Sequence, residues 1–517
     1  MFKNPKISER GKLNNIKLPK KWILVTLEDI LLSLESGGRP KGGVKNIKEG
    51  VPSIGGEHLT HNGEFDFSNV RYIPKEFYEN MKRGKIKRYD VLVVKDGATT
   101  GKTSFVSDSF PFKEAAVNEH VFILRTIERV SLPKYLFFWL LSPFGQNSVK
   151  ENFQGTAQGG INTLFVKNSK IPLPPLAEQQ RIVAKIEELF TRLDASVEAL
   201  KKAKEQIRRY RQAVLKYAFE GKLTEEWRKS FELSILNDEL KQNSPLKTQH
   251  STFTTKNYEP ATVLLERIKE ERKKKLGKKY RELPPIDTSE LPELPKGWVW
   301  VRLREIANDI NPGFPSGKHN KDNMGIPHLR PMNINFKGKI DLSNIKYIQP
   351  EKEFDKLIRG DILFNNTNSP ELLGKTCYIK ENTNWAYSNH MTRIRVNGSF
   401  VNPAWVSYCL HTLFLNGFFK LNCTHHVNQA SINTTFLSER VYIPFPPLAE
   451  QQQIVEEIER RFSVVDEVEK AIDNNLKQAE RLRQSILKRA FEGKLVPQDP
   501  NDEPAERLVE RILNDKC

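Results

Sequence analysis

The sequence contains an internal repeat with a fixed offset, and this repeat limits what the chain can fold into. Pro174-Pro-Leu-Ala-Glu-Gln-Gln180 recurs at residues 446–452, and Phe219-Glu-Gly-Lys-Leu223 recurs at residues 491–495. The offset is 272 residues for both motifs, so no net residue has been gained or lost between them. A segment whose length is kept while its side chains differ is expected to act as a rigid spacer.

Apolar residues recur every seven positions in both copies of this segment. The first copy has the row Ile186, Leu193, Leu200, Ile207 and Val214, with Leu189, Ala203, Tyr210 and Tyr217 beside it. The second copy has the row Ile458, Val465, Ile472, Ala479 and Ile486, and its companion row is interrupted by Arg461, Asn475 and Arg489. Such a repeat predicts helices that pair as a coiled coil, in which the polar residues fix the register. The alternative is a long helix that packs only on its own domain.

The expected ends of both helices carry matching signals. Each begins at a Pro-Pro pair and places Glu178 or Glu450 near the positive end of the helix dipole. Each ends at a glycine, Gly221 or Gly493. At about 1.5 Å per residue, each helix would be roughly 65 to 70 Å long.

The repeat continues upstream in a weaker form, with offsets between about 270 and 276 residues. Leu18-Pro-Lys-Lys-Trp22 matches Leu294-Pro-Lys-Gly-Trp298, and further matches follow up to residues 161–163 and 432–434. Between these anchors the copies differ, as residues 53–58 and 328–333 show. Short β-rich runs at 91–94 and 121–124, and a short buried helix at 132–141, predict a mixed α/β domain in each copy.

The segment from Thr224 to Glu293 separates the two copies. Its residues 242–258 are polar and rich in Ser, Thr and Asn, which is typical of a flexible linker. A basic helical piece begins at Pro260-Ala261 and resembles the C-terminal piece that begins at Pro504-Ala505. The repeat thus has a third shared element.

Charge and composition indicate a soluble protein with a polyanionic partner. The net charge is +18, and neutralised phosphates release counterions when such a chain binds nucleic acid. No apolar run is long enough for a membrane span, and the N-terminus lacks the apolar core of a secretory signal, so we expect a cytoplasmic location. Cys377, Cys409, Cys423 and Cys517 show no C-x-x-C spacing, so neither a disulfide framework nor a zinc site is predicted.

With these motifs assembled, the chain resembles the specificity subunits of Type I restriction-modification systems over nearly its full length. The most specific motif is P-P-L-A-E-Q-Q followed by an apolar heptad helix that ends in F-E-G-K-L, present twice. Gly38-Arg-Pro40 and Gly313-Phe-Pro315 also resemble a family element, whose usual form has threonine before the proline. Arg39 and Phe314 depart from it, so no role is carried over to them.

The resemblance implies an α+β fold with two mixed α/β target-recognition domains in pseudo-two-fold tandem, separated by two long antiparallel coiled-coil helices. The expected boundaries are 1–172 and 294–444 for the domains, 173–223 and 445–495 for the helices, 224–293 for the linker with its basic helix, and 496–517 for the tail. The expected partners are double-stranded DNA, two methyltransferase subunits and two restriction-translocase subunits. Each domain would read one half of an asymmetric target, and half-sites one helical turn apart lie about 34 Å from each other.

Four motifs that imitate catalytic or metal sites have simpler interpretations. Residues 97–103 resemble a phosphate-binding loop, but three residues separate its glycines where four are needed, so we predict a strand-turn-strand. Glu220-x-Lys222 and Glu492-x-Lys494 lie at helix ends without an upstream Asp. Around His425-His426 no carboxylate or cysteine other than Cys423 falls at ligand spacing, so we predict a loop pair, with a DNA contact as the alternative. The Pro-Pro pairs lack the Asn/Asp-Pro-Pro-Tyr form of amino-methyltransferases. We therefore expect no catalytic centre, cofactor or metal in this chain.

Basic and amide side chains on glycine-bracketed turns are the candidates for DNA contacts, because Arg or Lys reads guanine and Asn or Gln reads adenine in the major groove. The candidates are Lys41, Lys95, Lys102, Gln154, Gln158, Lys318, Asn365, Asn366, Lys375 and Gln429. The alternative for each is a solvated surface residue. The alternatives for the whole chain are a specificity subunit of a methylation-only system and a coiled-coil adaptor that binds protein or RNA.

Overall fold

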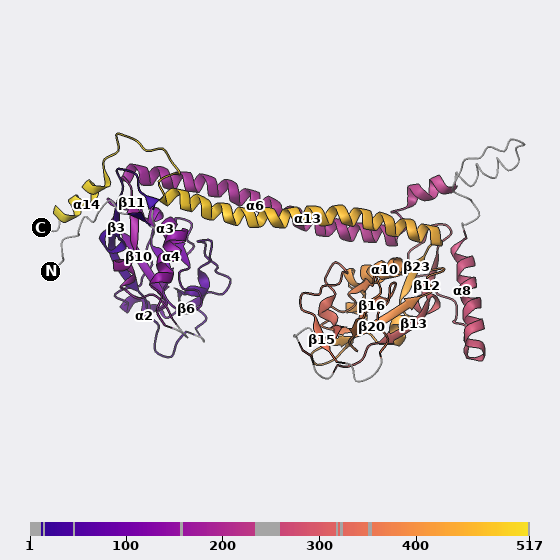
Figure 1. Ribbon diagram of the computed structural model, residues 1–517. Coiled ribbons are helices and arrows are strands. Elements are labelled where there is room, and N and C mark those ends of the chain that lie inside the picture. The colour runs from indigo at the N-terminus through magenta and orange to yellow at the C-terminus, as the bar shows by residue number, and fades with distance from the viewer. Residues whose placement is uncertain are drawn as a thin grey trace, which may run out of the picture. The chain divides into compact units, whose positions relative to one another are not determined.

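The computed structural model describes residues 12–13, 16–44, 47–155, 159–232, 259–316, 319–320, 324–349 and 354–514. The chain divides into two compact units. Unit 1 is Met1–Lys201 together with Ile472–Cys517, and unit 2 is Lys202–Ala471. The linker predicted at residues 242–258 lies outside the described residues. Each unit therefore combines one globular domain with parts of both long helices, α6 and α13 (Figure 1).

The two long helices have the same length and the same kind of end. Helix α6 runs over Leu176–Phe219 and α13 over Leu448–Phe491, which is 44 residues in each case. After each helix comes a glycine in the left-handed region, Gly221 with φ 71° and Gly493 with φ 70°. A Cβ at Gly493 would lie 2.4 Å from Pro19 Cγ, so this position requires glycine for space as well as conformation. The predicted start, stop and equal length are confirmed.

The predicted heptad rows are confirmed in part. The whole row from Ile458 to Ile486 in α13 is buried, while in α6 the two ends of the row, Ile186 and Val214, are buried and its centre is half-buried. The companion row was predicted wrongly at Tyr210 and Tyr217, which are exposed, while Arg211, Leu215 and Ala218 are buried in α6 instead. Its first member, Leu189, is half-buried and packs against the core of unit 1. Asn475 and Arg489 are also exposed, so neither fixes the register from inside a seam.

The helices pair in antiparallel orientation within each unit. In unit 1, Arg483 of α13 forms an ion pair with Asp194 of α6, and its guanidinium lies 4.3 Å from the centre of the Phe190 ring. In unit 2, Arg211 of α6 lies 2.5 Å from Asp466 of α13. Residues early in one helix therefore meet residues late in the other, as a coiled coil of two antiparallel helices requires.

The domain of unit 1 is built on a four-stranded antiparallel sheet of order β4-β10-β7-β8, beside a three-stranded sheet β6-β5-β9 and a pair β11-β3. The runs at 91–94 and 121–124 are strands and residues 133–141 are a buried helix, as predicted. The elements are β1 Lys12–Leu13, β2 Ile16–Lys17, β3 Ile23–Thr26, α1 Leu27–Ile30, β4 Leu31–Ser36, β5 Val51–Ile54, the 3₁₀ turn η1 Gly56–His58, β6 Arg71–Ile73, α2 Lys75–Asn80, β7 Val91–Val94, β8 Thr103–Phe105, β9 Ala116–Val117, β10 Val121–Thr126, α3 Pro133–Leu141, α4 Pro143–Glu151, α5 Phe165–Asn168, β11 Lys170–Leu173 and α14 Ala505–Asn514.

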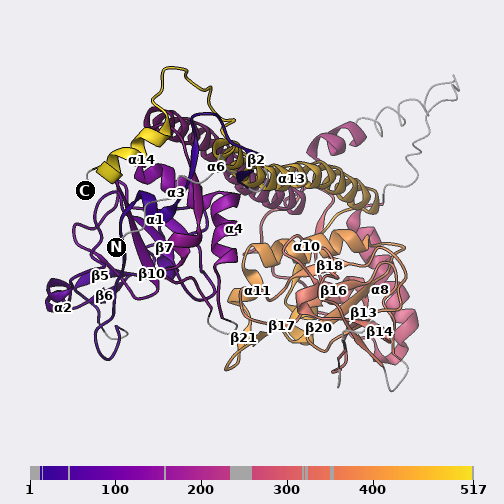
Figure 2. The same cartoon turned by 60° about the vertical axis from the view of Figure 1, so that its left-hand side comes forward.

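The domain of unit 2 has the same topology, with sheets of order β13-β20-β16-β18, β15-β14-β19 and β12-β23, and a small sheet β17-β22-β21. In Figure 2, β17 and β21 lie at the end of this unit that faces away from α13. The elements are α8 Ala261–Leu276, η3 Gly277–Lys279, β12 Val299–Arg302, α9 Leu303–Ile306, β13 Ala307–Pro312, β14 Ile326–Leu329, η4 Pro331–Asn333, β15 Lys346–Ile348, β16 Ile362–Asn365, β17 Thr367–Asn368, β18 Thr376–Tyr378, β19 Ala386–Tyr387, β20 Met391–Val396, α10 Pro403–Leu415, α11 Phe418–Leu421, β21 Thr424–His425, β22 Ala430–Ser431, α12 Thr434–Glu439 and β23 Tyr442–Phe445.

Each hydrophobic core is completed by a helix end from the other copy of the repeat. The core of unit 1 around Trp139 includes Phe491 at the end of α13 and Leu508 of α14. The core of unit 2 around Trp405 includes Ala218 near the end of α6 and Leu264 of α8. The third repeated element thus has the same role in both units, since α14 packs on the domain of unit 1 and α8 packs on the domain of unit 2.

The repeated motifs meet at one junction in each unit. In unit 1, Trp22 Nε1 donates to Glu178 Oε2 at 2.9 Å, and Gln498 Nε2 donates to Glu178 Oε1 at 2.5 Å. In unit 2, Trp298 Nε1 donates to Glu450 Oε2 at 2.8 Å, and Thr224 Oγ1 donates to Glu450 Oε1 at 2.7 Å. The P-P-L-A-E-Q-Q motif therefore recurs because its buried glutamate joins a domain to the far end of the other long helix.

Candidate nucleic-acid interface

Strand order brings several loops of unit 1 to one end of its central sheet. Ser36 at the end of β4 pairs with Phe122 near the start of β10, and Val94 at the end of β7 pairs with Val121. The loops after β4, between β7 and β8, and before β10 therefore meet at this edge. An isolated bridge between Asp96 and Gly160 adds a fourth segment. We call residues 37–44, 95–102, 118–120, 152–155 and 159–161 the loop end of unit 1.

Unit 2 forms the same end from the corresponding segments. Pro312 at the end of β13 pairs with Thr392 of β20, and Asn365 at the end of β16 pairs with Met391. The β21–β22 hairpin joins this edge through β17. The loop end of unit 2 comprises residues 313–316, 319–320, 366–375, 388–390 and 422–432.

Equivalent backbone hydrogen bonds occur within each of the two loop ends. Lys95 N donates to His120 O at 2.9 Å in unit 1, and Asn366 N donates to His390 O at 3.1 Å in unit 2. Ile161 N donates to Lys95 O at 2.6 Å, matched by Ile432 N to Asn366 O at 2.9 Å. Two loop ends with one backbone scaffold can present different side chains at equivalent places.

The side chains of unit 1 form a chain of charged contacts across this scaffold. Arg39 Nε lies 3.1 Å from Glu119 Oε2, and the other carboxylate oxygen of Glu119 lies 3.2 Å from His120 Nε2. His120 Nδ1 lies 2.5 Å from Asp96 Oδ1. All four side chains are partly exposed, so they are open to a ligand while holding one another.

At the corresponding described positions, the side chains of unit 2 are uncharged and form no such series of contacts. Thr367 follows Asn366 as Asp96 follows Lys95, Asn389 stands in place of Glu119, and the Gly-x-Pro element has Phe314 in place of Arg39. The Phe314 ring packs 5.5 Å from that of His328, whose burial lowers its pKa to about 4. Asn389 is exposed. The two loop ends therefore differ in chemistry although their backbones agree.

The residues predicted for unit 1 lie at its loop end, with different exposure. Lys41 and Gln154 are exposed, whereas Lys95 and Lys102 are half-buried. The ammonium of Lys95 lies 5.3 Å from the centre of the Phe122 ring, and Gln154 accepts a hydrogen bond from Asn162 at 3.3 Å. Gln158 lies outside the described residues.

Three residues predicted for unit 2 are buried. Asn365 donates to Leu372 O at 2.8 Å, Asn366 donates to Thr392 Oγ1 at 2.9 Å, and Lys375 donates to Ile334 O. Burial lowers the pKa of Lys375. These groups hold the turn between β16 and β18 in place, so we revise their assignment from base contacts to structural roles. The prediction assumed that a glycine-bracketed turn is solvated, whereas these three side chains are buried.

The other two predicted residues of unit 2 lie in loops of the loop end. Gln429 is exposed on the β21–β22 hairpin, and Lys318 lies outside the described residues. His425 and His426 are exposed on the same hairpin, in agreement with the predicted loop pair. The structure thus leaves Gln429 as the accessible candidate among the described residues predicted in this unit.

Sequence reasoning gave no role to Arg39 and overlooked Asp96, Glu119 and Asn389. Their positions were flanked by anchors of the repeat, since Asn118-Glu-His120 matches Ser388-Asn-His390 at an offset of 270 residues. These residues could have been identified by looking for repeat positions at which the two copies carry side chains of different charge.

Other features of the described chain do not resemble an active site. Residues 97–103 form a turn between β7 and β8, as predicted, and Lys222 Nζ donates to Glu220 at 2.8 Å. No group of three or more His, Cys, Asp or Glu among the described residues could hold a metal ion. Cys377, Cys409 and Cys423 are free thiols, and Cys517 lies outside the described residues. Among the helices described, none is long and apolar enough to cross a membrane.

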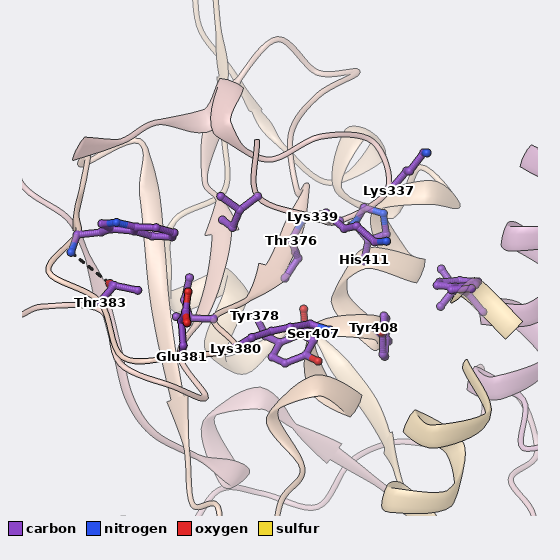
Figure 3. A pocket seen from close by; sticks show the side chains of 16 residues that line it. Lys337, Lys339, Thr376, Tyr378, Lys380, Glu381, Thr383, Ser407, Tyr408 and His411 are labelled. Atoms are coloured by element: carbon purple, nitrogen blue, oxygen red, sulfur yellow. Dashed lines mark hydrogen bonds between the residues drawn. The ribbon is translucent and has the colours of Figure 1, made fainter. Parts of the chain in front are cut away.

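A pocket of about 330 Å³ lies in unit 2 between β18, α10 and the long helices (Figure 3). Its lining includes the aromatic rings of Tyr378 and Tyr408 and three lysines at the rim. Lys337 lies 2.7 Å from Glu469, Lys339 pairs with Asp466, and Lys380 lies 3.0 Å from Glu459. Because these amines are already paired with carboxylates of α13, the pocket is not a basic site for nucleic acid.

Two copies of one scaffold with different exposed loops are typical of a protein that recognises two different surfaces. The sequence family described as the Type I restriction modification DNA specificity domain matches residues 19–209 and 295–478, which is most of the chain. The chain therefore belongs to the family of Type I restriction-modification DNA specificity proteins, and DNA recognition is its role at that level. The resemblance inferred from the repeated motifs is confirmed.

Individual relatives match along the whole chain. The chain is 26% identical over 527 residues to the Type I restriction enzyme EcoKI specificity subunit of Escherichia coli strain K12, covering 97% of each chain. It is 23% identical over 523 residues to the StySPI specificity subunit of Salmonella potsdam, covering 98% of this chain and 97% of the relative. A chain from a solved structure of a Type I restriction-modification system aligns with a TM-score of 0.63 at 21% identity, over 93% of this chain and all of that chain. This structural likeness supports the fold, with two mixed α/β domains and two long helices.

Proposed function

We propose that this chain recognises an asymmetric, bipartite DNA target, in which the loop end of unit 1 reads one half-site and the loop end of unit 2 reads the other. The observation that carries the proposal is the shared backbone of the two loop ends together with their different side chains. Identical side chains would favour two equal half-sites, whereas the linked contacts of Arg39, Glu119 and His120 have no counterpart at the matching described positions of unit 2. The excess of positive charge on the whole chain, +18, favours a polyanion as the partner.

The two long helices are proposed to set the unspecified gap between the half-sites. Both have 44 residues, and the row from Ile458 to Ile486 is buried along the length of α13. A helix of this length spans about 66 Å at 1.5 Å per residue, and a paired helix is stiff where a glycine-rich linker is not. A fixed gap is the expected consequence.

Methylation and cleavage are proposed to reside in partner subunits, two adenine methyltransferases and two translocase-nucleases for each copy of this chain. The relatives are named as specificity subunits of restriction enzymes, and the motifs that imitate catalytic sites are accounted for by a turn and an ion pair at a helix end. The chain itself would bind DNA and orient its partners without a reaction of its own.

Methylome sequencing tests the proposal. A host that lacks other adenine methylation would express this chain with its methyltransferase subunit, and the same host with the methyltransferase alone is the control. We expect one modified motif made of two different short segments with a fixed gap, absent in the control. A palindromic or continuous motif would contradict the two-domain recognition. A restriction assay against unmethylated phage, with and without the nuclease subunit, tests the part of the proposal that concerns cleavage.

The spacer role has its own test. Insertion of one heptad into both α6 and α13 keeps the seven-residue pattern and lengthens each helix by about 10 Å. We expect the same two half-sites with a gap longer by up to about three base pairs, since base pairs are spaced by about 3.4 Å. An insertion into α6 alone breaks the antiparallel register and serves as the matched control. An unchanged gap after the double insertion would exclude the helices as the spacer.

A further inference from the structure

The loop end of unit 1 holds an arginine, Arg39, beside a carboxylate. Its Nε lies 3.1 Å from a carboxylate oxygen of Glu119, so an ion pair holds the guanidinium beside that carboxylate. No hydrogen bond of its terminal amino groups is seen within the part of the chain that the structure describes. The two terminal amino groups are therefore available as a pair of parallel donors, which is the geometry that a bidentate acceptor such as guanine requires.

A series of contacts fixes the carboxylate behind this arginine. The second oxygen of Glu119 lies 3.2 Å from His120 Nε2, and His120 Nδ1 contacts Asp96. The backbone before it is also held, because His120 N donates to the side-chain oxygen of Asn118 at 2.9 Å and Asn118 is buried. Glu119 is thus a positioning residue for Arg39 rather than a free surface acid.

The charges around Arg39 distinguish a base edge from a phosphate. One carboxylate, that of Glu119, pairs with the guanidinium and offsets its charge, while Asp96 contacts His120 on the other side of Glu119. A phosphate bound to Arg39 would lie close to the Glu119 carboxylate and would be repelled by it. The O6 and N7 atoms of guanine are neutral acceptors and meet no such repulsion, so the cluster favours the floor of the major groove over the DNA backbone.

Unit 2 presents a different group on the same scaffold. Ser388 N donates to Leu329 O at 2.9 Å, as Asn118 N donates to Ile54 O at 3.0 Å, so the next residue, Asn389, takes the place of Glu119. Asn389 is exposed, and no side-chain partner for it is seen among the described residues. With Phe314 in the Gly-x-Pro element there is no arginine to position, and the free amide matches the N6 and N7 edge of adenine.

We propose that Arg39, positioned by Glu119, reads a guanine in the first half-site, and that Asn389 reads an adenine in the second. This inference rests on the proposed function and names the residues that determine specificity at one position of each half-site. Its consequence is a target with a G·C pair that depends on unit 1 and an A·T pair that depends on unit 2.

The test uses the full chain in complex with its methyltransferase subunit, once the wild-type motif is known. Methylation rates on DNA duplexes with each base pair of the motif replaced in turn would be compared for wild type, R39A, R39K, E119Q and N389A. We expect R39A and R39K to lower discrimination at one G·C position of the first half-site by about ten- to hundred-fold, the value of a bidentate contact. E119Q should lower discrimination at the same G·C position by a smaller factor than R39A. N389A should lower discrimination at one A·T position of the second half-site only.

R39K keeps the charge and loses the fork, so it separates base reading from attraction to phosphate. Full discrimination in R39K, or a uniform loss on all duplexes with a smaller salt dependence in R39A, would overturn the assignment of Arg39. An unchanged second half-site in N389A would overturn the assignment of Asn389. A wild-type motif without two half-sites would instead refute the proposed function, so the two failures are distinguishable.

Discussion

Removal of the buried carboxylate of Glu450 should open unit 2 locally. Glu450 is fully buried at the start of α13 and accepts hydrogen bonds from Trp298 at 2.8 Å and Thr224 at 2.7 Å. It also forms an ion pair with Arg228, whose side chain is 16% exposed. These contacts join β12, the end of α6 and the start of α13 at one point. The substitution Glu450→Ala leaves three donors without their acceptor.

The magnitude follows from the loss of one partner of a buried ion pair, which costs about 3–5 kcal/mol. Since 1.36 kcal/mol corresponds to a factor of ten, the equilibrium constant for opening this junction should rise by between about 2.2 and 3.7 orders of magnitude. The same substitution at an exposed ion pair should cost about 1 kcal/mol or less. Glu439, which pairs with Arg304 near the surface of the same unit, provides that control.

Hydrogen-deuterium exchange measured by mass spectrometry resolves this effect by segment. In Glu450→Ala, amides of β12 (Val299–Arg302) and its partner β23 should exchange at least about a hundred times faster, whereas Glu439→Ala should leave them nearly unchanged. Peptides of β3 in unit 1, which has its own junction at Glu178, should not respond. Equal exchange of the β12 amides in the two variants would refute the reasoning that the buried glutamate holds the junction.

Three further predictions concern stability. Burial lowers the pKa of His411 to about 4 from 6.5, so between these pH values the unfolded state binds a proton that the folded state does not. The stability of unit 2 should therefore fall as the pH falls from about 6.5 to 4. Urea unfolding at pH 7 and pH 5 should show a smaller loss of stability in His411→Gln than in the wild type. Val465→Ala should cost about 1.5–3 kcal/mol, but its neighbour Val464, 59% exposed, should tolerate alanine within about 0.5 kcal/mol; equal effects in denaturant unfolding would speak against the buried row. Gly493→Ala should destabilise unit 1 by more than about 1 kcal/mol, because a Cβ there is strained at φ 70° and lies 2.4 Å from Pro19 Cγ; an unchanged melting temperature would contradict this.

Local patterns in the sequence predicted the long helices and the strands at 91–94 and 121–124. Helix periodicity, the Pro-Pro start and the glycine stop act between residues a few positions apart, so they can be recognised without knowledge of the fold. The prediction of the companion row was wrong where a residue distant in the sequence determines which side chain of α6 is buried. Arg211 is buried because Asp466 and Glu469 of α13 lie within reach, and Tyr210 is exposed as a result.

The candidate site shows the same division. Lys41 and Gln429 were recognised from glycine-bracketed turns and are exposed, but the same reasoning selected Asn365 and Lys375, which are buried. Whether a polar side chain on a turn faces solvent or the interior depends on which segments cover the turn. In unit 2 the carbonyl groups of Leu372 and Ile334 accept from these two side chains, and no local pattern shows that they lie there.

The sequence by itself determined that the chain contains two copies of one architecture with two helices of equal length, because a constant offset of 272 residues can be counted and a seven-residue period reflects the geometry of a single helix. Only the tertiary structure decided which helix end completes the hydrophobic core of each domain, since Phe491 of α13 packs in the domain of unit 1 and Ala218 of α6 packs in that of unit 2. It also decided which side chains share the loop end. Arg39, Asp96 and Glu119 lie far apart in the sequence and meet because antiparallel strands return their ends to one edge of a sheet.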